Sequence, residues 1–267
     1  MAIMALVCAL GFAACGSNSG AVIKIGTQTY TEPKIVAEMY KKLIEDRTDL
    51  QVEIIPDLAA SPVVINALKE NEIQMASILY SGEVFNNYFD VEDTKDRQRV
   101  LQLAQEGFDE HYGFRWFDSF GFENTYGFTV RADVAEQYGL ETVSDLAAVA
   151  DDMRLGVDTT WLERPNDGYQ AFKEFYGFEF AQTFPMEISL VYEAVANNEM
   201  DVVLAYTTDP RLIEFNLKVL KDDKQFFAPF DASPVIRKDT LEAHPELEDV
   251  IGLLVGQIDA ETMTALN

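Results

Sequence analysis

Cysteine and histidine are scarce in this chain of 267 residues, which has two of each. Cys8 and Cys15 both lie near the start, so the remainder offers no thiol for a disulfide, a catalytic nucleophile or a metal cluster. His111 and His244 lie in no recognisable motif, and no HExxH, GxxxxGK[ST] or strand-following GxGxxG occurs. We therefore expect neither an enzyme nor a metal or cofactor site.

Basic residues are also few. Lys and Arg number 20 against 46 Asp and Glu, which leaves a formal net charge of −26. Such a surface repels nucleic acid and anionic lipid head groups, so a DNA or RNA partner is not expected. An acidic surface attracts cations, but salt screens that field beyond about 8–10 Å. A highly soluble protein from a salty or acidic setting explains the charge equally well.

Long apolar runs are missing, apart from one at the N-terminus. The run MAIMALVCALGFAAC is too short to span a membrane and is followed by the polar GSNSG. We expect residues 1–14 to be a secretory signal and residues 15–21 a linker. Cys15 at the cleavage point resembles a bacterial lipobox, with Phe12 replacing the usual Leu and no Lys or Arg before the run. The prediction is a lipoprotein anchored through Cys15 to the outer face of the cell membrane.

The segment after the linker alternates between strand and helix patterns. AVIKIG predicts a strand ending at Gly26, and KIVAEMYKKLIED has apolar residues at helical spacing. LQVEIIP predicts the next strand. Ser61 and Pro62 then suit the N-cap and first turn of a helix, VVINALKENE. IQMASILY completes the unit as a strand that ends on Tyr80.

A second segment repeats this order. LVYEAVANNEMDVVLAYTTDP resembles VVINALKENEIQMASILYSGE: each has a helix, Asn-Glu, a strand, a tyrosine, a polar pair and an acid. The corresponding tyrosines are Tyr80 and Tyr206. The register differs by one residue, so a chance likeness of two β-α-β segments stays possible as an alternative.

Alternating strands and helices predict α/β layers with mostly parallel sheets, and the repetition predicts two lobes. We place residues 22–125 and 230–267 in the first lobe and residues 126–229 in the second. The first crossing should fall in FGFENTYGFTVRADVAEQYG and the return crossing in LKDDKQFFAPFDASPVIRKD. Ligands of open α/β sheets bind outside the carboxyl ends of the strands, where Gln28, Tyr80, Trp161 and Tyr206 are expected.

Aromatic residues make up 12% of the chain, and several are expected at strand ends and in crossings. Aromatic faces attract cations, and cages for quaternary ammonium groups are their main binding use. The alternative is that each tyrosine belongs to the core with its hydroxyl satisfied. For Tyr80, Tyr126 and Tyr206 taken together, we favour a binding site for a small cation.

The stretches KIGTQTYT, SPVVINALKENEIQMASILYSGE, GFENTYGFTVRADVAE, AYTTD and FFAPFDASPVIRKD closely resemble one family. It comprises the substrate-binding proteins of osmoprotectant ABC importers, the glycine betaine/carnitine/choline-binding lipoproteins of Gram-positive bacteria. The resemblance covers residues 22–267. It implies a type II periplasmic-binding-protein fold, with two α/β lobes, a hinge and an inter-lobe ligand cleft. It also implies a monomer without catalytic activity that delivers its ligand to the permease and ATPase subunits of an importer.

Members of this family hold trimethylammonium groups in a tyrosine-rich cage. By local motif, the resemblance assigns cage walls to Tyr80, Tyr126 and Tyr206. The further cleft candidates are Gln28 in the first loop, Phe226 or a neighbour near the return crossing, and Trp161, Asp167 and Tyr169.

Glu83 departs from the Tyr-Thr-Gly-Thr pattern of many members. Facing the ligand, its charge would repel the carboxylate of betaine or carnitine and tolerate the hydroxyl of choline. Alternatively, Ser81 caps a helix and Glu83 faces solvent in its first turn, or the free N–H groups there bind a ligand carboxylate. The chain ends at ETMTALN, sooner than the family usually does, so we expect a partial sequence. An enzyme on a bilobal scaffold, a structural lipoprotein and a binder of another small cation or amino acid remain alternatives.

Overall fold

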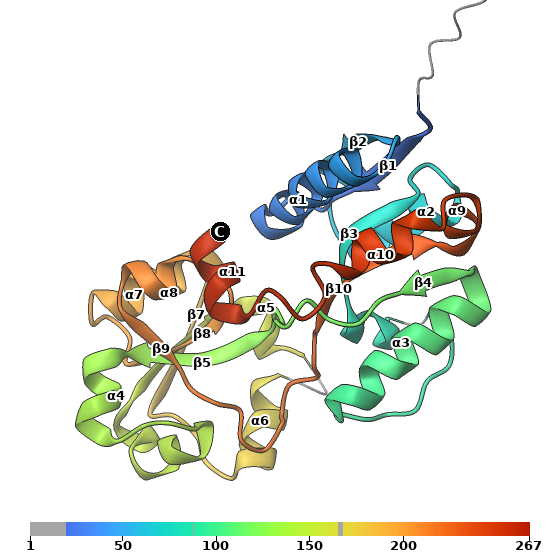
Figure 1. The fold of residues 1–267 in the computed structure, drawn as a ribbon. Helices are drawn as coiled ribbons and strands as arrows, with labels where there is room; N and C mark the ends of the chain where they lie inside the picture. Colours follow the sequence, from blue (N-terminus) through green and yellow to red (C-terminus); the bar gives the residue numbers. More distant parts are fainter. Residues whose placement is uncertain (1–19, 87, 165–167) are drawn as a thin grey trace, which may run out of the picture.

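The computed structural model describes residues 20–86, 88–164 and 168–267 (Figure 1). The predicted signal segment, Cys15 and Asp167 lie outside the described residues. Within the described part of the chain, no helix has the length and apolar character needed to cross a membrane. The chain forms two α/β lobes, each built on its own five-stranded sheet.

The first lobe has strand order β2-β1-β3-β10-β4. Strand β1 pairs in parallel with β2 and β3, and β10 pairs antiparallel with β3 and β4. The strands are β1 (Val22–Gly26), β2 (Gln51–Ile55), β3 (Met75–Tyr80), β4 (Phe114–Trp116) and β10 (Ala232–Arg237). The helices are α1 (Thr31–Arg47), α2 (Ser61–Lys69), the 3-10 turn η1 (Ser81–Phe85), α3 (Arg97–Tyr112), α9 (Lys238–Ala243) and α10 (Glu246–Gly252).

The second lobe has the corresponding order β7-β6-β8-β5-β9. Its strands are β5 (Tyr126–Arg131), β6 (Arg154–Asp158), β7 (Gln182–Met186), β8 (Val202–Tyr206) and β9 (Leu217–Val219). Its α-helices are α4 (Ala132–Tyr138), α5 (Thr159–Leu162), α6 (Tyr169–Tyr176), α7 (Val191–Ala196) and α8 (Arg211–Glu214). Its 3-10 turns are η2 (Val143–Ala148), η3 (Ala150–Asp152) and η4 (Ile188–Leu190).

The sequence repeat corresponds to a repeated backbone turn. Asn71 and Asn198 follow the ends of α2 and α7 in the left-handed region, at φ 57° and 61°. The next N–H groups, of Glu72 and Glu199, each donate a 2.9 Å hydrogen bond back to an alanine carbonyl in the preceding helix. Asparagine tolerates this conformation better than most residues. The Asn-Glu pair therefore ends the helix in both lobes and directs the chain into β3 or β8.

Two predicted helix caps were wrong. Ser61 is the first residue of α2, and Ala60 occupies the N-cap position. Ser81 does not cap η1 with its side chain. Its hydroxyl instead donates to the carbonyl of Pro229 at 3.3 Å and accepts from the N–H of Asp231 at 2.9 Å. The serine therefore attaches the end of β3 to the return crossing.

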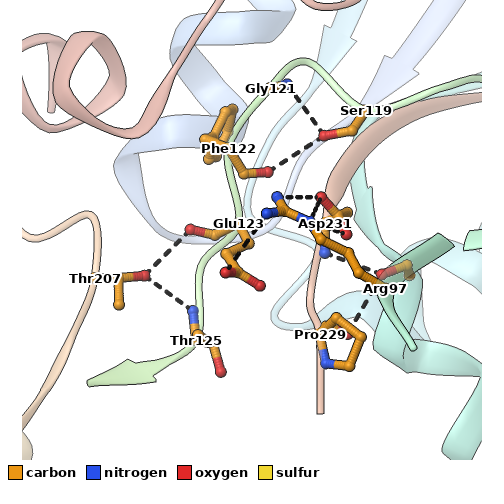
Figure 2. A network of polar contacts seen from close by, with 10 residues as sticks. Arg97, Ser119, Gly121, Phe122, Glu123, Thr125, Thr207, Pro229 and Asp231 are labelled. Carbon is orange, nitrogen blue, oxygen red and sulfur yellow. Dashed lines mark hydrogen bonds and ion pairs between the residues drawn. The ribbon is translucent and has the colours of Figure 1, made fainter. Parts of the chain in front are cut away.

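The two crossings lie side by side between the sheets, where an isolated bridge joins Glu123 to Asp231 (Figure 2). Arg97 at the start of α3 donates to both carboxylate oxygens of Asp231, and its guanidinium lies 4.0 Å from Glu123. From the second lobe, the Thr207 hydroxyl donates to the Glu123 carbonyl and accepts from the Thr125 N–H, both at 3.2 Å. The residue after Tyr206 is thus bonded directly to the first crossing.

Helix α11 (Ala260–Leu266) contacts both lobes. Its Met263 is buried in the core of the first lobe, and the helix packs against α1 there. On its other side it packs against α8 of the second lobe. The sequence prediction places residues 230–267 wholly in the first lobe, whereas α11 at the end of that range also contacts α8 of the second lobe.

Candidate functional site

A cavity of about 430 Å³ lies between the lobes at the carboxyl ends of β3 and β8. The first lobe and the crossings line it with Tyr30, Thr31, Glu32, Ser61, Tyr80, Glu83, Asn124 and Phe230. The second lobe and the segment after α11 add Tyr206, Thr208, Asp209, Pro210 and Asn267. The lining has four aromatic rings and three carboxylates, and none of its described residues is basic.

Tyr80 is fixed in place from several sides. It ends β3, is 4% exposed, and its ring stacks on Tyr30 with the centroids 6.5 Å apart. Its hydroxyl donates to Oε1 of Glu32, which is itself buried at the start of α1. Burial raises the pKa of Tyr80 well above its usual value, so the phenol stays neutral. The first lobe therefore presents a rigid, uncharged aromatic face to the cavity.

Tyr206 is the corresponding residue of the second lobe, and it is 37% exposed. It faces Tyr126 across the antiparallel pair of β8 and β5, and the two rings stack with centroids 5.1 Å apart. The buried Tyr192 accepts a hydrogen bond from the Tyr206 N–H at 3.0 Å. Tyr126 itself is not part of the cavity lining; it supports the back of the Tyr206 ring.

Phe230 supplies the aromatic of the return crossing. It lines the cavity directly above Gly82, where an added Cβ would lie 2.6 Å from the Phe230 ring. A side chain at position 82 would thus collide with the ring, so glycine is what lets the ring lie against η1. The predicted residue, Phe226, is 2% exposed and packs in the core of the second lobe. Phe230, four residues further along the chain, reaches the cavity in place of Phe226.

These features, a two-lobe fold with an aromatic cavity between the lobes, agree with comparisons with known proteins. The family of substrate-binding domains of ABC-type glycine betaine transport systems matches residues 21–267. The chain belongs to this family.

Individual relatives support the assignment. The carnitine transport binding protein OpuCC of Listeria monocytogenes is 43% identical over 252 residues, covering 94% of this chain and 82% of the relative. A glycine-betaine-binding protein of Pseudomonas aeruginosa is 32% identical over 279 residues, covering 99% and 86%. A crystal structure of a glycine betaine/carnitine/choline ABC transporter protein superimposes with a TM-score of 0.88 at 38% identity, covering 91% of this chain and 89% of that one. The predicted family and fold class are confirmed.

Glu83 of this substrate-binding domain is 6% exposed and lines the cavity, so the interpretation in which it faces solvent was wrong. Burial raises the pKa of its carboxyl group, while hydrogen bonds from Ser61 and Asn86 oppose that rise. The Asn86 amide lies 2.7 Å from Oε2. Among the described residues, its hydrogen-bond partners Ser61 and Asn86 are neutral, so the Glu83 carboxylate lines the cavity without a counter-charge.

Asp209 is the corresponding acid of the second lobe, and its negative charge is balanced by Arg211. Arg211 donates to both of its carboxylate oxygens, at 2.8 and 2.7 Å. Although burial opposes it, this hydrogen bonding holds the pKa of Asp209 below its usual value. The Arg211 guanidinium also lies 3.9 Å from the centre of the Tyr192 ring. Asp209 thus belongs to a structural network behind Tyr206.

The remaining predicted residues lie behind the cavity or away from it. Gln28 is fully buried and donates to the Ile78 carbonyl at 3.1 Å and to the Ser61 hydroxyl at 3.3 Å. It thereby supports Ser61, which does line the cavity. Trp161 is 0% exposed in the core of the second lobe, and Tyr169 packs against that core and accepts from a backbone N–H at 3.0 Å.

Sequence reasoning missed Tyr30, Glu32 and Asn124 as lining residues. A signal was present for the first two, because they occupy the same loop as Gln28, in TQTYTEP. Asn124 lies in the ENTYG of the predicted first crossing, two residues before Tyr126. Its role depends on contact with Glu32, which is distant in the sequence.

Proposed function

We propose that this protein is the extracytoplasmic substrate-binding subunit of an ABC importer and captures small quaternary ammonium ions in the inter-lobe cavity. The observation that carries the proposal is the cavity lining: Tyr30, Tyr80, Tyr206 and Phe230 surround a space without a basic residue among those described. The names of the relatives, which refer to carnitine and glycine betaine, favour the same class of ligand.

The chemistry of the ligand suits this lining. A quaternary ammonium group has no N–H to donate, so aromatic faces bind it better than a set of hydrogen-bond acceptors would. Each cation–π contact contributes about 0.5–1 kcal/mol when exposed and about 2 kcal/mol or more when desolvated. Tyr206, like Tyr30, is an exposed member of the cage, and closure of the lobes would cover its ring. Closure therefore strengthens binding by removing water from the cation and the ring together.

Glu83 sets the preference within this class. A carboxylate in the wall repels the carboxylate of glycine betaine or carnitine, whereas it can accept a hydrogen bond from the choline hydroxyl. We therefore propose choline, or another cation with a neutral tail, as the preferred ligand. Its delivery to permease and ATPase subunits, and anchoring of a monomer by an acylated Cys15, complete the proposal.

The first test is isothermal titration of the protein lacking residues 1–14 with choline and with glycine betaine at one salt concentration. Tight choline binding with weak betaine binding is the expected result. Equal affinities would remove Glu83 as the discriminating residue and leave a broad osmolyte binder. No heat and no rise in Tm with either compound, from a folded protein, would contradict the cage and reopen the alternatives.

A further inference from the structure

Glu32 is a buried carboxylate in the cavity wall. It is 2% exposed and lies in the first turn of α1, a helix of 17 residues. The N-terminal end of a helix interacts favourably with a negatively charged side chain, and Glu32 occupies that position. No ion pair to Glu32 is present among the described residues, and no basic residue lines the cavity beside it.

The hydrogen-bond donors to Glu32 are all neutral and come from different parts of the fold. The Tyr80 hydroxyl reaches Oε1 from β3, and the Asn124 amide reaches the same oxygen at 2.8 Å from the first crossing. The Asn267 amide lies 3.4 Å from Oε2. Glu32 thus connects a wall of the aromatic cage to the first crossing between the lobes.

The charge of the cavity is unbalanced as a result. Of its three carboxylates, Asp209 is paired with Arg211, with 2.7 Å between Oδ2 and Nη2. Within residues 20–86, 88–164 and 168–267, Glu32 and Glu83 have only neutral donors. A desolvated charge without a partner of opposite sign is costly. The cavity therefore has an excess of negative charge, and its aromatic rings are suited to bind a cation.

We propose that Glu32 is a second specificity residue, which provides counter-charge to the cationic ligand and at the same time positions the Tyr80 ring. This rests on the proposed function, because the ligand is taken to be a quaternary ammonium ion. The charge contribution favours a cation with a neutral tail over a zwitterion, since the zwitterion's own carboxylate is repelled by the same group. The positioning contribution acts equally on both kinds of ligand, because they share the trimethylammonium group.

The test compares choline and glycine betaine by isothermal titration in wild type, Glu32→Gln and Tyr80→Phe. Glutamine keeps the size and an acceptor for Tyr80 and Asn124 but removes the charge. We expect Glu32→Gln to weaken choline binding by about tenfold or more and to weaken betaine binding much less, because the loss of one partner from a desolvated charge pair is costly. Tyr80→Phe removes only the hydroxyl contact, so it should weaken both ligands by a similar factor and preserve the choline-to-betaine ratio.

The outcomes separate this inference from the proposed function. Wild-type protein that binds neither ligand would contradict the proposed function and this inference together. Wild-type binding with an unchanged choline-to-betaine ratio in Glu32→Gln would overturn this inference alone and leave Glu32 a structural residue. If Glu32→Gln does not fold, Glu32→Asp replaces it: the shorter carboxylate should lose overall affinity but keep the ratio, and a lost ratio would overturn the inference.

Discussion

The ends of β3 and β8 occupy equivalent places in the two lobes, yet their tyrosines are held differently. Tyr80 is 4% exposed and its hydroxyl is bonded to Glu32. Tyr206 is 37% exposed, and its ring rests on Tyr126. The antiparallel neighbour explains part of the difference: opposite Tyr80 is Ala232, which leaves room, whereas opposite Tyr206 is another tyrosine. Tyr80 is therefore held as a preformed wall in the first lobe, while Tyr206 of the second lobe offers an open face.

The acids that follow these tyrosines, Glu83 and Asp209, differ in whether a cationic side chain is paired with them and in the direction of their pKa shifts. Glu83 has no cationic partner in the part of the chain that the structure describes, and burial raises its pKa. Asp209 is paired with Arg211 and its pKa is lowered, although burial opposes the shift. In the first lobe, the repeated unit therefore ends in a carboxylate whose described partners are neutral. In the second lobe, it ends in a carboxylate that is paired with an arginine. Under the proposed function, we expect the ligand to be recognised mainly on the first lobe and the second lobe to close over it.

The largest expected effect separates the two tyrosines. Tyr80→Ala should lower the free energy of unfolding by about 3–5 kcal/mol, because it empties a buried aromatic site. Tyr206→Ala should leave the apo protein folded, with a change below about 1 kcal/mol, but weaken choline binding by about 2 kcal/mol or about 30-fold. Chemical denaturation and titration measure both. Equal destabilisation by the two substitutions would refute the contrast between a preformed and an open wall.

The pH dependence of stability should sharpen the contrast between the acids. The folded-state pKa of Glu83 is raised above 4.5, so the stability gained from its bound proton is lost as pH rises from 4.5 through the folded value. Glu83→Gln should thus become more stable relative to wild type over that rise. The pKa of Asp209 is lowered from 3.8, so its contribution is present above 3.8 and is lost as pH falls through the folded value.

Asp209→Asn is the matched control. It should cost about 1.5–3 kcal/mol at neutral pH, because charge-assisted hydrogen bonds from Arg211 are weakened. Thermal unfolding of both variants and wild type from about pH 8 down to about pH 2.5, below the usual pKa of an aspartate, measures the difference curves. Curves of the same sign would show that the two acids are equivalent. The choline-to-betaine ratio should change in Glu83→Gln and remain within about twofold in Asp209→Asn.

The smallest expected effect is at Gly82, which lies between Tyr80 and Glu83 in the sequence. Gly82→Ala places a Cβ 2.6 Å from the Phe230 ring, which must shift out of the cavity wall. Overpacking of this kind costs about 1 kcal/mol, so choline affinity should fall by about fivefold. The equivalent residue of the second lobe is Thr208, and Thr208→Ala should change the affinity by less than about twofold. A larger loss from Thr208→Ala would place the discriminating contacts on the second lobe.

Local patterns predicted the strands, the repeat and the tyrosines at the ends of β3 and β8, because burial periodicity and turn residues are properties of neighbouring residues. Local patterns failed to predict the site where several similar side chains lie close together in the sequence. In FFAPF, periodicity cannot say which ring turns into the core and which into the cavity, and the structure buries Phe226 while Phe230 lines the site. Trp161 was expected in the cleft because it follows a strand, but the short helix α5 carries it back into the core.

By itself, the sequence determined that this is an acidic two-lobe α/β protein with tyrosines at the ends of two corresponding strands, because alternation, charge and repetition are properties of nearby residues. Only the tertiary structure decided which acids carry usable charge. Asp209 finds Arg211 two residues away, whereas Glu32 meets Tyr80 and Asn124 across separations of 48 and 92 residues. Burial and counter-charge arise when distant segments pack together, and these set the electrostatics of the cavity.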